Sequence, residues 1–221
     1  MQRYFVSHEG APLSEQDQRH IVKVLRMRSG ERIIVCNGVC FEATITIENG
    51  MVNYQKEIEL DKIKKRKITL IQGIPKHPKI ETTIKYASMI GVSEILLVPM
   101  KYSVIQTVPS KQKLHRYDMI AKEASELAHR DDLPIIKAVP KLEDIPLNTK
   151  TYLLDETTKE IPKDVPTEDL IIIVGPEGGI HPYERQMLLS KGAIQMTLGP
   201  HIMSSEIAGV VALSKFIHFD I

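Results

Sequence analysis

Cysteine is scarce in this chain, and no apolar segment is long. Only two of the 221 residues are cysteine, Cys36 and Cys40, which flank the hairpin turn signal Asn37-Gly38. Without a nearby pair of histidines they make a poor metal site, so we expect free thiols on neighbouring strands and a reducing cytoplasm. The longest apolar runs, such as residues 170–174, are far too short to span a bilayer, and no secretory signal opens the chain. We therefore expect a soluble cytoplasmic protein with no metal and no membrane partner.

The composition is that of a globular protein, but the charge is unevenly spread. Hydrophobic residues make up 43% and charged residues 26%, enough for one large domain or two small ones. Residues 1–150 hold 24 Lys and Arg against 18 Asp and Glu, a surplus of +6, whereas residues 151–221 hold 5 against 10, which leaves −5. A basic front part suits the binding of a polyanion. Uneven surface charge without any partner explains the same numbers equally well.

Residues 1–60 have the alternating pattern of short strands. ERIIVCNG followed by VCFEATITIENG predicts a hairpin with turns at Asn37-Gly38 and Asn49-Gly50, and YQKEIEL predicts a further strand. Between residues 13 and 25 we expect a helix with Ser14 as its N-cap. The pattern is typical of a small β-barrel.

After Lys67 the period of the apolar residues changes. Continuous apolar strands now alternate with helices, which predicts an α/β fold with a parallel sheet covered on both faces. The charged run DKIKKRK at 61–67 is interpreted as a solvated linker. We therefore predict two domains, residues 1–66 and residues 67–221.

Three loops of the second domain are candidates for a ligand site, because ligands of open α/β sheets bind at the carboxyl ends of strands. They follow residues 152–155, 171–175 and 195–199. The second reads GPEGGI and the third LGPHIMSSEIA, and each precedes a helix. Glycines let backbone groups come close to a ligand. Two Gly-Pro loops at the ends of neighbouring strands are a more specific signal than either loop alone.

Several absent residues narrow the ligand. A phosphate cradle needs a Lys or Arg beside the glycines, whereas the only charge in GPEGGI is Glu177. The GxGxxG dinucleotide fingerprint and the GxSxG nucleophile elbow are also absent. Backbone groups with one carboxylate better suit a neutral ring or a cationic ligand. For GPEGG alone, an ordinary glycine-rich turn is a serious competing interpretation.

Taken together, these motifs resemble the SPOUT methyltransferases. The resemblance rests on GPEGG after an apolar strand, LG-P-x-I about twenty residues later, and S-E-x-A at the start of the last helix. RYFV at 3–6, H-x-x-K-V-L-R at 20–26 and G-E-R-I-x-V at 30–35 resemble the branch that methylates N3 of a uridine in 16S ribosomal RNA. The resemblance spans the whole chain. It implies a PUA-like β-barrel, then an α/β domain with a deep trefoil knot, and a homodimer with its active site at the subunit interface.

The resemblance also implies S-adenosylmethionine as cofactor, held in the knot largely by backbone atoms. In this interpretation the glycines admit the adenine and methionine moieties, and no phosphate has to be bound. The implied contacts are Leu154, Gly175, Glu177, Gly178, Gly179, Leu198, Gly199, Ile202 and Met203.

Methylation of uracil N3 requires removal of its proton, so a base, or a cation that stabilises the developing anion, is expected. Glu206 and His201 are the candidate catalytic residues. Glu206 serves equally well as a favourable charge at a helix N-terminus. His201 stands where the family commonly has an arginine, and it serves equally well to fill that space.

The RNA partner, 16S ribosomal RNA or the small ribosomal subunit, is expected to meet a set of basic residues. Phosphate contacts would make its binding salt-dependent, and a flipped-out or looped uridine is the natural substrate form. The candidate RNA contacts are Arg3, His20, Lys23, Arg26, Arg28 and Arg130.

The chain departs from the family pattern at several polar positions. The last loop of the family commonly reads LGPRILRTETA, whereas His201 and Ser204 stand in place of its two arginines, and Tyr102 stands where an arginine is usual. Two alternatives therefore stay open, a methyltransferase for a different RNA site and an RNA-binding protein without catalysis.

Overall fold

The computed structural model describes residues 1–61, 65–162 and 166–217. The chain divides into two compact units, residues 1–64 with 125–133 and residues 65–124 with 134–221. Residues 125–133 join the first unit although they lie far along the chain, and within that unit the Phe5 backbone N–H donates to Glu126 Oε1 at 3.2 Å. A division at residue 66 does not anticipate this exchange, and the domain limits stay a prediction. Part of the expected linker, residues 62–64, lies outside the described residues.

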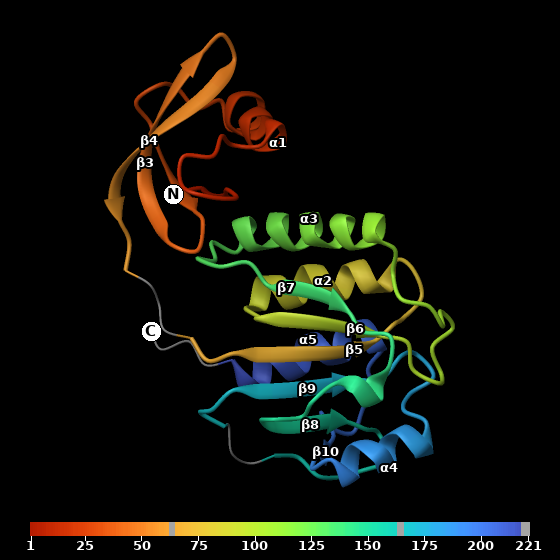
Figure 1. The fold of residues 1–221 in the computed structure, drawn as a ribbon. Helices are drawn as coiled ribbons and strands as arrows, with labels where there is room; N and C mark the ends of the chain where they lie inside the picture. Colours follow the sequence, from red (N-terminus) through yellow and green to blue (C-terminus); the bar gives the residue numbers. More distant parts are fainter. Residues whose placement is uncertain (62–64, 163–165, 218–221) are drawn as a thin grey trace. The chain divides into compact units, whose positions relative to one another are not determined.

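The first unit is built on a four-stranded sheet (Figure 1). Its strands are, in spatial order, β1 (Arg3–Phe5), β2 (Arg32–Cys36), β3 (Cys40–Glu48) and β4 (Met51–Glu59). β1 runs parallel to β2, and the turns at Asn37-Gly38 and Asn49-Gly50 join antiparallel pairs as predicted. YQKEIEL is the second half of β4 and not a further strand, so that prediction is wrong.

The expected helix of the first unit is two short pieces, α1 (Glu15–Arg19) and the π-helix η1 (His20–Val24). Ser14 is the N-cap as predicted, since its hydroxyl accepts the backbone N–H of Asp17 at 3.1 Å. Ile21 is fully buried and packs with side chains of the sheet. The apolar side of this helical segment therefore closes the core of the unit.

The two cysteines contradict the expectation drawn from them. Cys36 and Cys40 are opposite partners across the β2–β3 hairpin, with their Cα atoms 4.1 Å apart, and they form a disulfide. The tight turn at Asn37-Gly38 places them directly across the ladder, which the count of cysteines does not reveal. The prediction of free thiols is wrong, and the inference of a reducing compartment loses its support.

The second unit contains a six-stranded sheet whose neighbouring strands are all parallel, as predicted. The spatial order is β10-β8-β9-β5-β6-β7. Its strands are β5 (Ile68–Gly73), β6 (Glu94–Val98), β7 (Ile135–Ala138), β8 (Lys150–Leu154), β9 (Leu170–Val174) and β10 (Ile194–Met196). β9 is buried at every position, which explains why its sequence is an unbroken apolar run.

Helices cover both faces of this sheet, again as predicted. One core holds side chains of α2 (Lys79–Ile90), α3 (Lys111–Leu127) and α5 (Ser205–Phe216) against one face. A second core holds α4 (Pro182–Ser190) and the 3-10 turn η2 (Leu142–Asp144) against the other. The trefoil knot stays a prediction from the resemblance.

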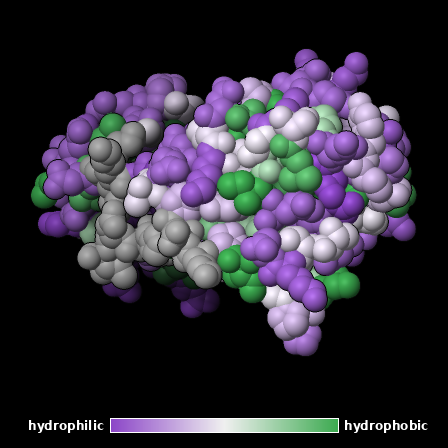
Figure 2. Space-filling model, turned by 90° about the horizontal axis from the view of Figure 1, so that it is seen from below, coloured by the Kyte–Doolittle hydropathy of each residue, from purple (hydrophilic) through white to green (hydrophobic). Residues whose placement is uncertain are grey.

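The outer surface is mainly polar where it can be inspected. Figure 2 shows one face of the molecule, on which hydrophilic residues surround several small hydrophobic groups. Among the described residues, no helix combines the length and the apolar character needed to cross a bilayer.

Gly73, at the end of β5, allows the loop after β9 to lie directly against the sheet. A Cβ atom at this position would be 2.6 Å from Pro176 Cδ and 2.7 Å from the Pro176 backbone nitrogen. At Gly209 in α5 the same atom would be 3.3 Å from Leu70 Cδ1 and 3.4 Å from Gln72 Oε1, which are ends of side chains.

We expect Gly73→Ala to lower the free energy of unfolding by about 1–3 kcal/mol, since the backbone at Pro176 has to move. Gly209→Ala is the matched control and should cost clearly less, because side chains can shift and alanine favours a helix over glycine by about 1 kcal/mol. Urea unfolding of both variants measures the difference. Equal losses would show that the approach at Pro176 is not tight.

Candidate functional site

Three loops at one edge of the parallel sheet enclose a cavity of about 800 Å³. They follow β8, β9 and β10, which are adjacent in the sheet, so their carboxyl ends meet. The two Gly-Pro loops are not on neighbouring strands as expected, because β8 lies between β9 and β10. The volume is that of a typical site for a small molecule or cofactor.

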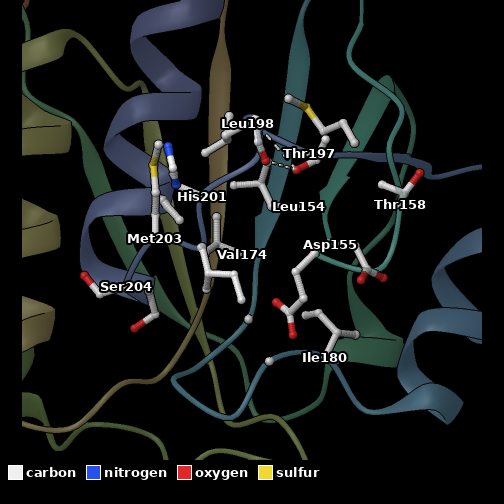
Figure 3. A pocket seen from close by; sticks show the side chains of 18 of the residues that line it. Leu154, Asp155, Thr158, Val174, Ile180, Thr197, Leu198, His201, Met203 and Ser204 are labelled. Carbon is white, nitrogen blue, oxygen red and sulfur yellow. Dashed lines mark hydrogen bonds between the residues drawn. The ribbon is translucent and has the colours of Figure 1, made fainter.

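Every residue predicted to contact the cofactor lines this cavity. Figure 3 shows the apolar side chains of Leu154, Leu198 and Met203 around it, with His201 beside them. Glu206 is not among the lining residues, although its neighbour Ser205 is. The predicted set that lines the cavity is Leu154, Gly175, Glu177, Gly178, Gly179, Leu198, Gly199, Ile202 and Met203.

The glycines of GPEGG have packing roles that the sequence does not reveal. A Cβ atom on Gly175 would lie 2.9 Å from the carbonyl carbon of Gly179, so the loop folds back on itself. A Cβ on Gly178 would lie 2.8 Å from Cβ of Tyr102. Gly179 has φ of +75°, a conformation that favours glycine. Close approach within the protein therefore explains these glycines at least as directly as close approach to a ligand.

Lys79 links two carboxylates beside the cavity. Its ammonium nitrogen lies 3.7 Å from Glu177 Oε1 and 3.3 Å from Glu206 Oε2. Glu177 also accepts the backbone N–H of Lys76 at 3.0 Å, so it does satisfy a loop amide. Burial alone would raise the pKa of Glu206, but hydrogen bonds from its own backbone N–H, Lys79 and Ser204 hold that pKa below its usual value. Glu206 is therefore an anion at neutral pH with Lys79 as its counter-charge.

Lys79 lines the cavity and was missed by the sequence reasoning. It opens α2, and the sequence offers one signal for it. PKHPK comes directly after the carboxyl end of β5, the edge at which ligands of such sheets bind.

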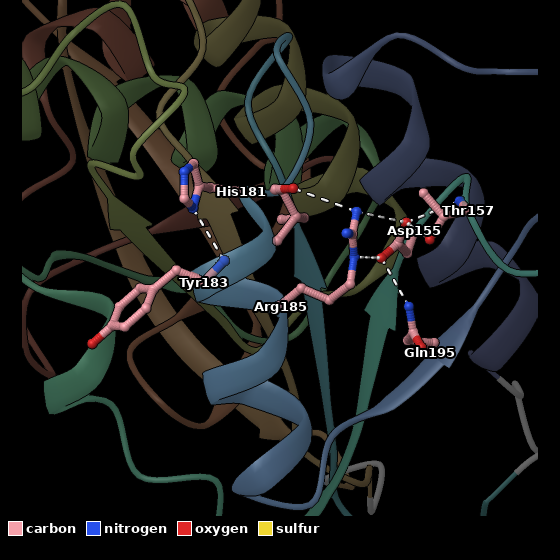
Figure 4. Close-up of polar contacts among 7 residues, drawn as sticks. Asp155, Thr157, His181, Tyr183, Arg185 and Gln195 are labelled. Carbon is pink, nitrogen blue, oxygen red and sulfur yellow. Dashed lines mark hydrogen bonds and ion pairs between the residues drawn. The ribbon is translucent and has the colours of Figure 1, made fainter.

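A buried ion pair joins the three loops from below (Figure 4). Asp155, whose side chain is 1% exposed, pairs with Arg185 of α4 and accepts the side-chain amide of Gln195 at 3.0 Å. It also accepts the backbone N–H and the hydroxyl of Thr157 at 2.9 and 2.8 Å. Arg185 Nη2 in turn donates to the carbonyl oxygen of Ile180 at 3.4 Å. One carboxylate and one guanidinium thus hold the chain after β8, the chain after β9 and β10 together.

The pKa of Asp155 reflects this network. Burial alone would raise it, but the hydrogen bonds from Arg185, Thr157 and Gln195 lower it below the ordinary value for aspartate. The carboxylate is consequently charged at neutral pH and fully paired. Sequence reasoning named the loop after Asp155 but not this pair, because Asp155 and Arg185 are far apart in the chain.

The predicted RNA contacts lie in different surroundings. Lys23, Arg26 and Arg28 are exposed, whereas Arg3 is partly buried. His20 Nδ1 lies 3.0 Å from the hydroxyl of Tyr4, which holds its ring in place. Arg130 does not fit the prediction, since it is only 6% exposed and pairs with Asp132 at 2.9 Å.

No group of three or more His, Cys, Asp or Glu suited to a metal occurs within residues 1–61, 65–162 and 166–217.

We expect Asp155→Asn to lower the free energy of unfolding at neutral pH by about 3–5 kcal/mol, because Arg185 loses its buried partner. The folded pKa of Asp155 is depressed, so its stabilisation is present above the ordinary pKa of aspartate, near 4, and is lost as pH falls through the lower folded value. Urea unfolding of both proteins between neutral pH and about pH 3 should show the difference shrinking with acid. A difference independent of pH would contradict this role of the carboxylate.

The comparisons with known proteins agree with this architecture. Residues 62–217 match the RNA methyltransferase domain family, and residues 13–50 match the RNA methyltransferase PUA domain. The ribosomal RNA small subunit methyltransferase E of Bacillus subtilis is 27% identical over 249 aligned residues, which cover 97% of this chain and 95% of that protein. The protein of the same name from Mesomycoplasma hyopneumoniae is 27% identical over 98% of this chain and 99% of its own length.

Solved structures give the same result. A methyltransferase of Legionella pneumophila, in complex with bound SAM, superposes with a TM-score of 0.84 at 25% identity, over 97% of this chain and 96% of that one. A ribosomal RNA small subunit methyltransferase E of Neisseria gonorrhoeae, also bound to S-adenosyl methionine, has the same fold, with a TM-score of 0.83 at 24% identity over 97% and 96%. With 156 residues inside the match at 62–217 and a PUA match before it, this chain belongs to the RNA methyltransferase domain family.

Proposed function

We propose that this chain is an S-adenosylmethionine-dependent methyltransferase that methylates N3 of a specific uridine in 16S ribosomal RNA. The observation that carries the proposal is the three-loop cavity, which gathers all nine residues implied for the cofactor in a chain of the RNA methyltransferase family. Relatives that match nearly the whole chain carry the name ribosomal RNA small subunit methyltransferase E. The choice of N3 rests on the resemblance in the barrel motifs.

The lining of the cavity fits S-adenosylmethionine. Leu154, Leu198 and Met203 offer apolar walls for an adenine ring, and the Gly-Pro loops offer backbone groups. Glu177 provides a negative charge for the cationic parts of the ligand. When bound, S-adenosylmethionine supplies an electrophilic methyl group carried on a positively charged sulfur.

The proton on uracil N3 has to leave as the new bond forms, and His201 is the better placed candidate to accept it. His201 lines the cavity, whereas Glu206 lies behind it and is already paired with Lys79. A neutral imidazole accepts a proton readily, while a carboxylate whose pKa is lowered is a weak base. Lys79 lies at the same wall, where its positive charge opposes build-up of negative charge on a uracil anion.

The exposed residues Lys23, Arg26 and Arg28 are proposed to bind RNA phosphates from the first unit. We also propose a homodimer, which rests on the resemblance alone. A cytoplasmic location would follow from a ribosomal substrate, and no longer from the cysteines.

We expect the purified protein to transfer a labelled methyl group from S-adenosylmethionine to unmodified small ribosomal subunits, giving 3-methyluridine in digested 16S RNA. His201→Ala should lower the turnover number by about a hundredfold or more, the usual worth of a general base. Calorimetric titration should find its affinity for S-adenosylmethionine within about twofold of the original. Glu206→Gln is the comparison, and it should lose less activity.

Each part of this proposal can fail separately. Loss of activity in Glu206→Gln with full activity in His201→Ala would reverse the assignment of the base. Methyl transfer to another RNA, mapped across total RNA, would move the target. Saturable cofactor binding with no transfer to any RNA would leave the cofactor site standing and remove the catalytic role.

A further inference from the structure

Four residues beside the cavity form a partly exposed surface of aromatic and basic side chains, here called the aromatic shelf. It consists of Lys101, Tyr102, His181 and Tyr183. Tyr102 and Tyr183 are 46% and 54% exposed, which is high for such large rings. The rings of Tyr102 and His181 meet edge to face with centroids 5.1 Å apart, and the Lys101 ammonium lies 4.6 Å from the centre of the Tyr183 ring.

The aromatic shelf is held in place from beneath. The backbone N–H of Lys101 donates to Oε1 of the buried Glu184 at 2.8 Å, which fastens the turn after β6 to the first turn of α4. The same turn is closed by the Ser103 hydroxyl, which accepts the Met100 N–H at 3.1 Å. His181 Nδ1 accepts the backbone N–H of Tyr183 at 3.1 Å (Figure 4). The rings are thus presented by two fastened segments.

The aromatic shelf adjoins the cavity through the glycine loop. Tyr102 packs against Gly178, and His181 follows Ile180 directly in the chain. Gly178 and Ile180 both line the cavity. A nucleotide that reaches the cavity therefore has its neighbours in the chain within reach of these rings.

Exposed aromatic rings with an adjacent cation are the surface that single-stranded nucleic acid prefers, since bases stack on the rings and phosphates meet the cation. An apolar protein partner would not call for the lysine over Tyr183. Because His181 Nδ1 is an acceptor, the proton of the neutral ring is on Nε2, where it can be donated to a base.

We propose that the aromatic shelf binds an unpaired base next to the target nucleotide by stacking on Tyr102 and Tyr183. This deepens the proposed function and rests on it for the identity of the RNA. The rings would compensate for the arginine whose place Tyr102 takes, by replacing a phosphate contact with a stacking contact.

The test measures binding of fluorescent single-stranded oligouridylate by anisotropy. Tyr102→Ala and Tyr183→Ala should each weaken binding about fivefold or more, the range found when a stacking aromatic is removed. Tyr102→Phe and Tyr183→Phe should stay within about twofold, because phenylalanine keeps the ring. Tyr86→Ala is the matched control, since Tyr86 is 43% exposed with Lys85 over its ring but does not line the cavity, and it should bind as the original does.

Salt separates stacking from charge. The two tyrosine-to-alanine variants should leave the slope of log affinity against log salt unchanged, whereas Lys101→Met should reduce it by about 0.7, one phosphate contact on a single strand. Equal losses in Tyr86→Ala, or no rescue by phenylalanine, would overturn the proposal.

Parallel titrations with S-adenosylmethionine and sedimentation of each variant keep other causes apart. Cofactor affinity and subunit number should not change. A shift from dimer to monomer in Tyr102→Ala or Tyr183→Ala would assign the surface to a second copy of the chain and overturn the RNA assignment. If the original protein binds oligouridylate through these rings but methylates no ribosomal RNA, the proposed function fails while the stacking surface stands.

Discussion

The buried ion pair between Asp155 and Arg185 is the contact on which the cavity depends. A parallel sheet brings the ends of β8, β9 and β10 to one edge, but it does not decide how the loops beyond them lie. Asp155 and Arg185, with Gln195 and the carbonyl of Ile180, connect all three segments through groups that have little or no access to water. Because an unpaired charge at this depth is costly, the loops are held in one arrangement.

The charges that face the cavity are arranged differently from those beneath it. Lys79 lies between Glu177 and Glu206, which are a carboxylate of the glycine loop and a carboxylate of α5. Two anions and one cation leave this wall with a net negative charge, partly open to water. Such a wall favours a cationic ligand over a phosphate, which agrees with the absence of a Lys or Arg inside GPEGGI. The preference is set by residues from three separate elements.

Most of the fold could be predicted from local pattern. The unbroken apolar run of β9 and the helices around it follow from burial on both faces, and Ser14 follows from the chemistry of helix caps. What failed depends on contacts between distant residues. The disulfide of Cys36 and Cys40 depends on hairpin register, the burial of Arg130 depends on where residues 125–133 pack, and the role of Gly178 depends on Tyr102. Neither composition nor spacing contains these pairings.

The departures from the family pattern gain a physical sense once the site is assembled. At the last loop, His201 and Ser204 leave a cavity wall with fewer fixed cations, so a uracil anion there must rely on Lys79. At the turn after β6, Tyr102 gives a ring where a guanidinium is usual, and that ring adjoins His181. Guanidinium and aromatic rings both stack on bases, but only the guanidinium pairs strongly with phosphate. The exchange thus lowers the dependence of RNA binding on charge while keeping a flat surface beside the cavity.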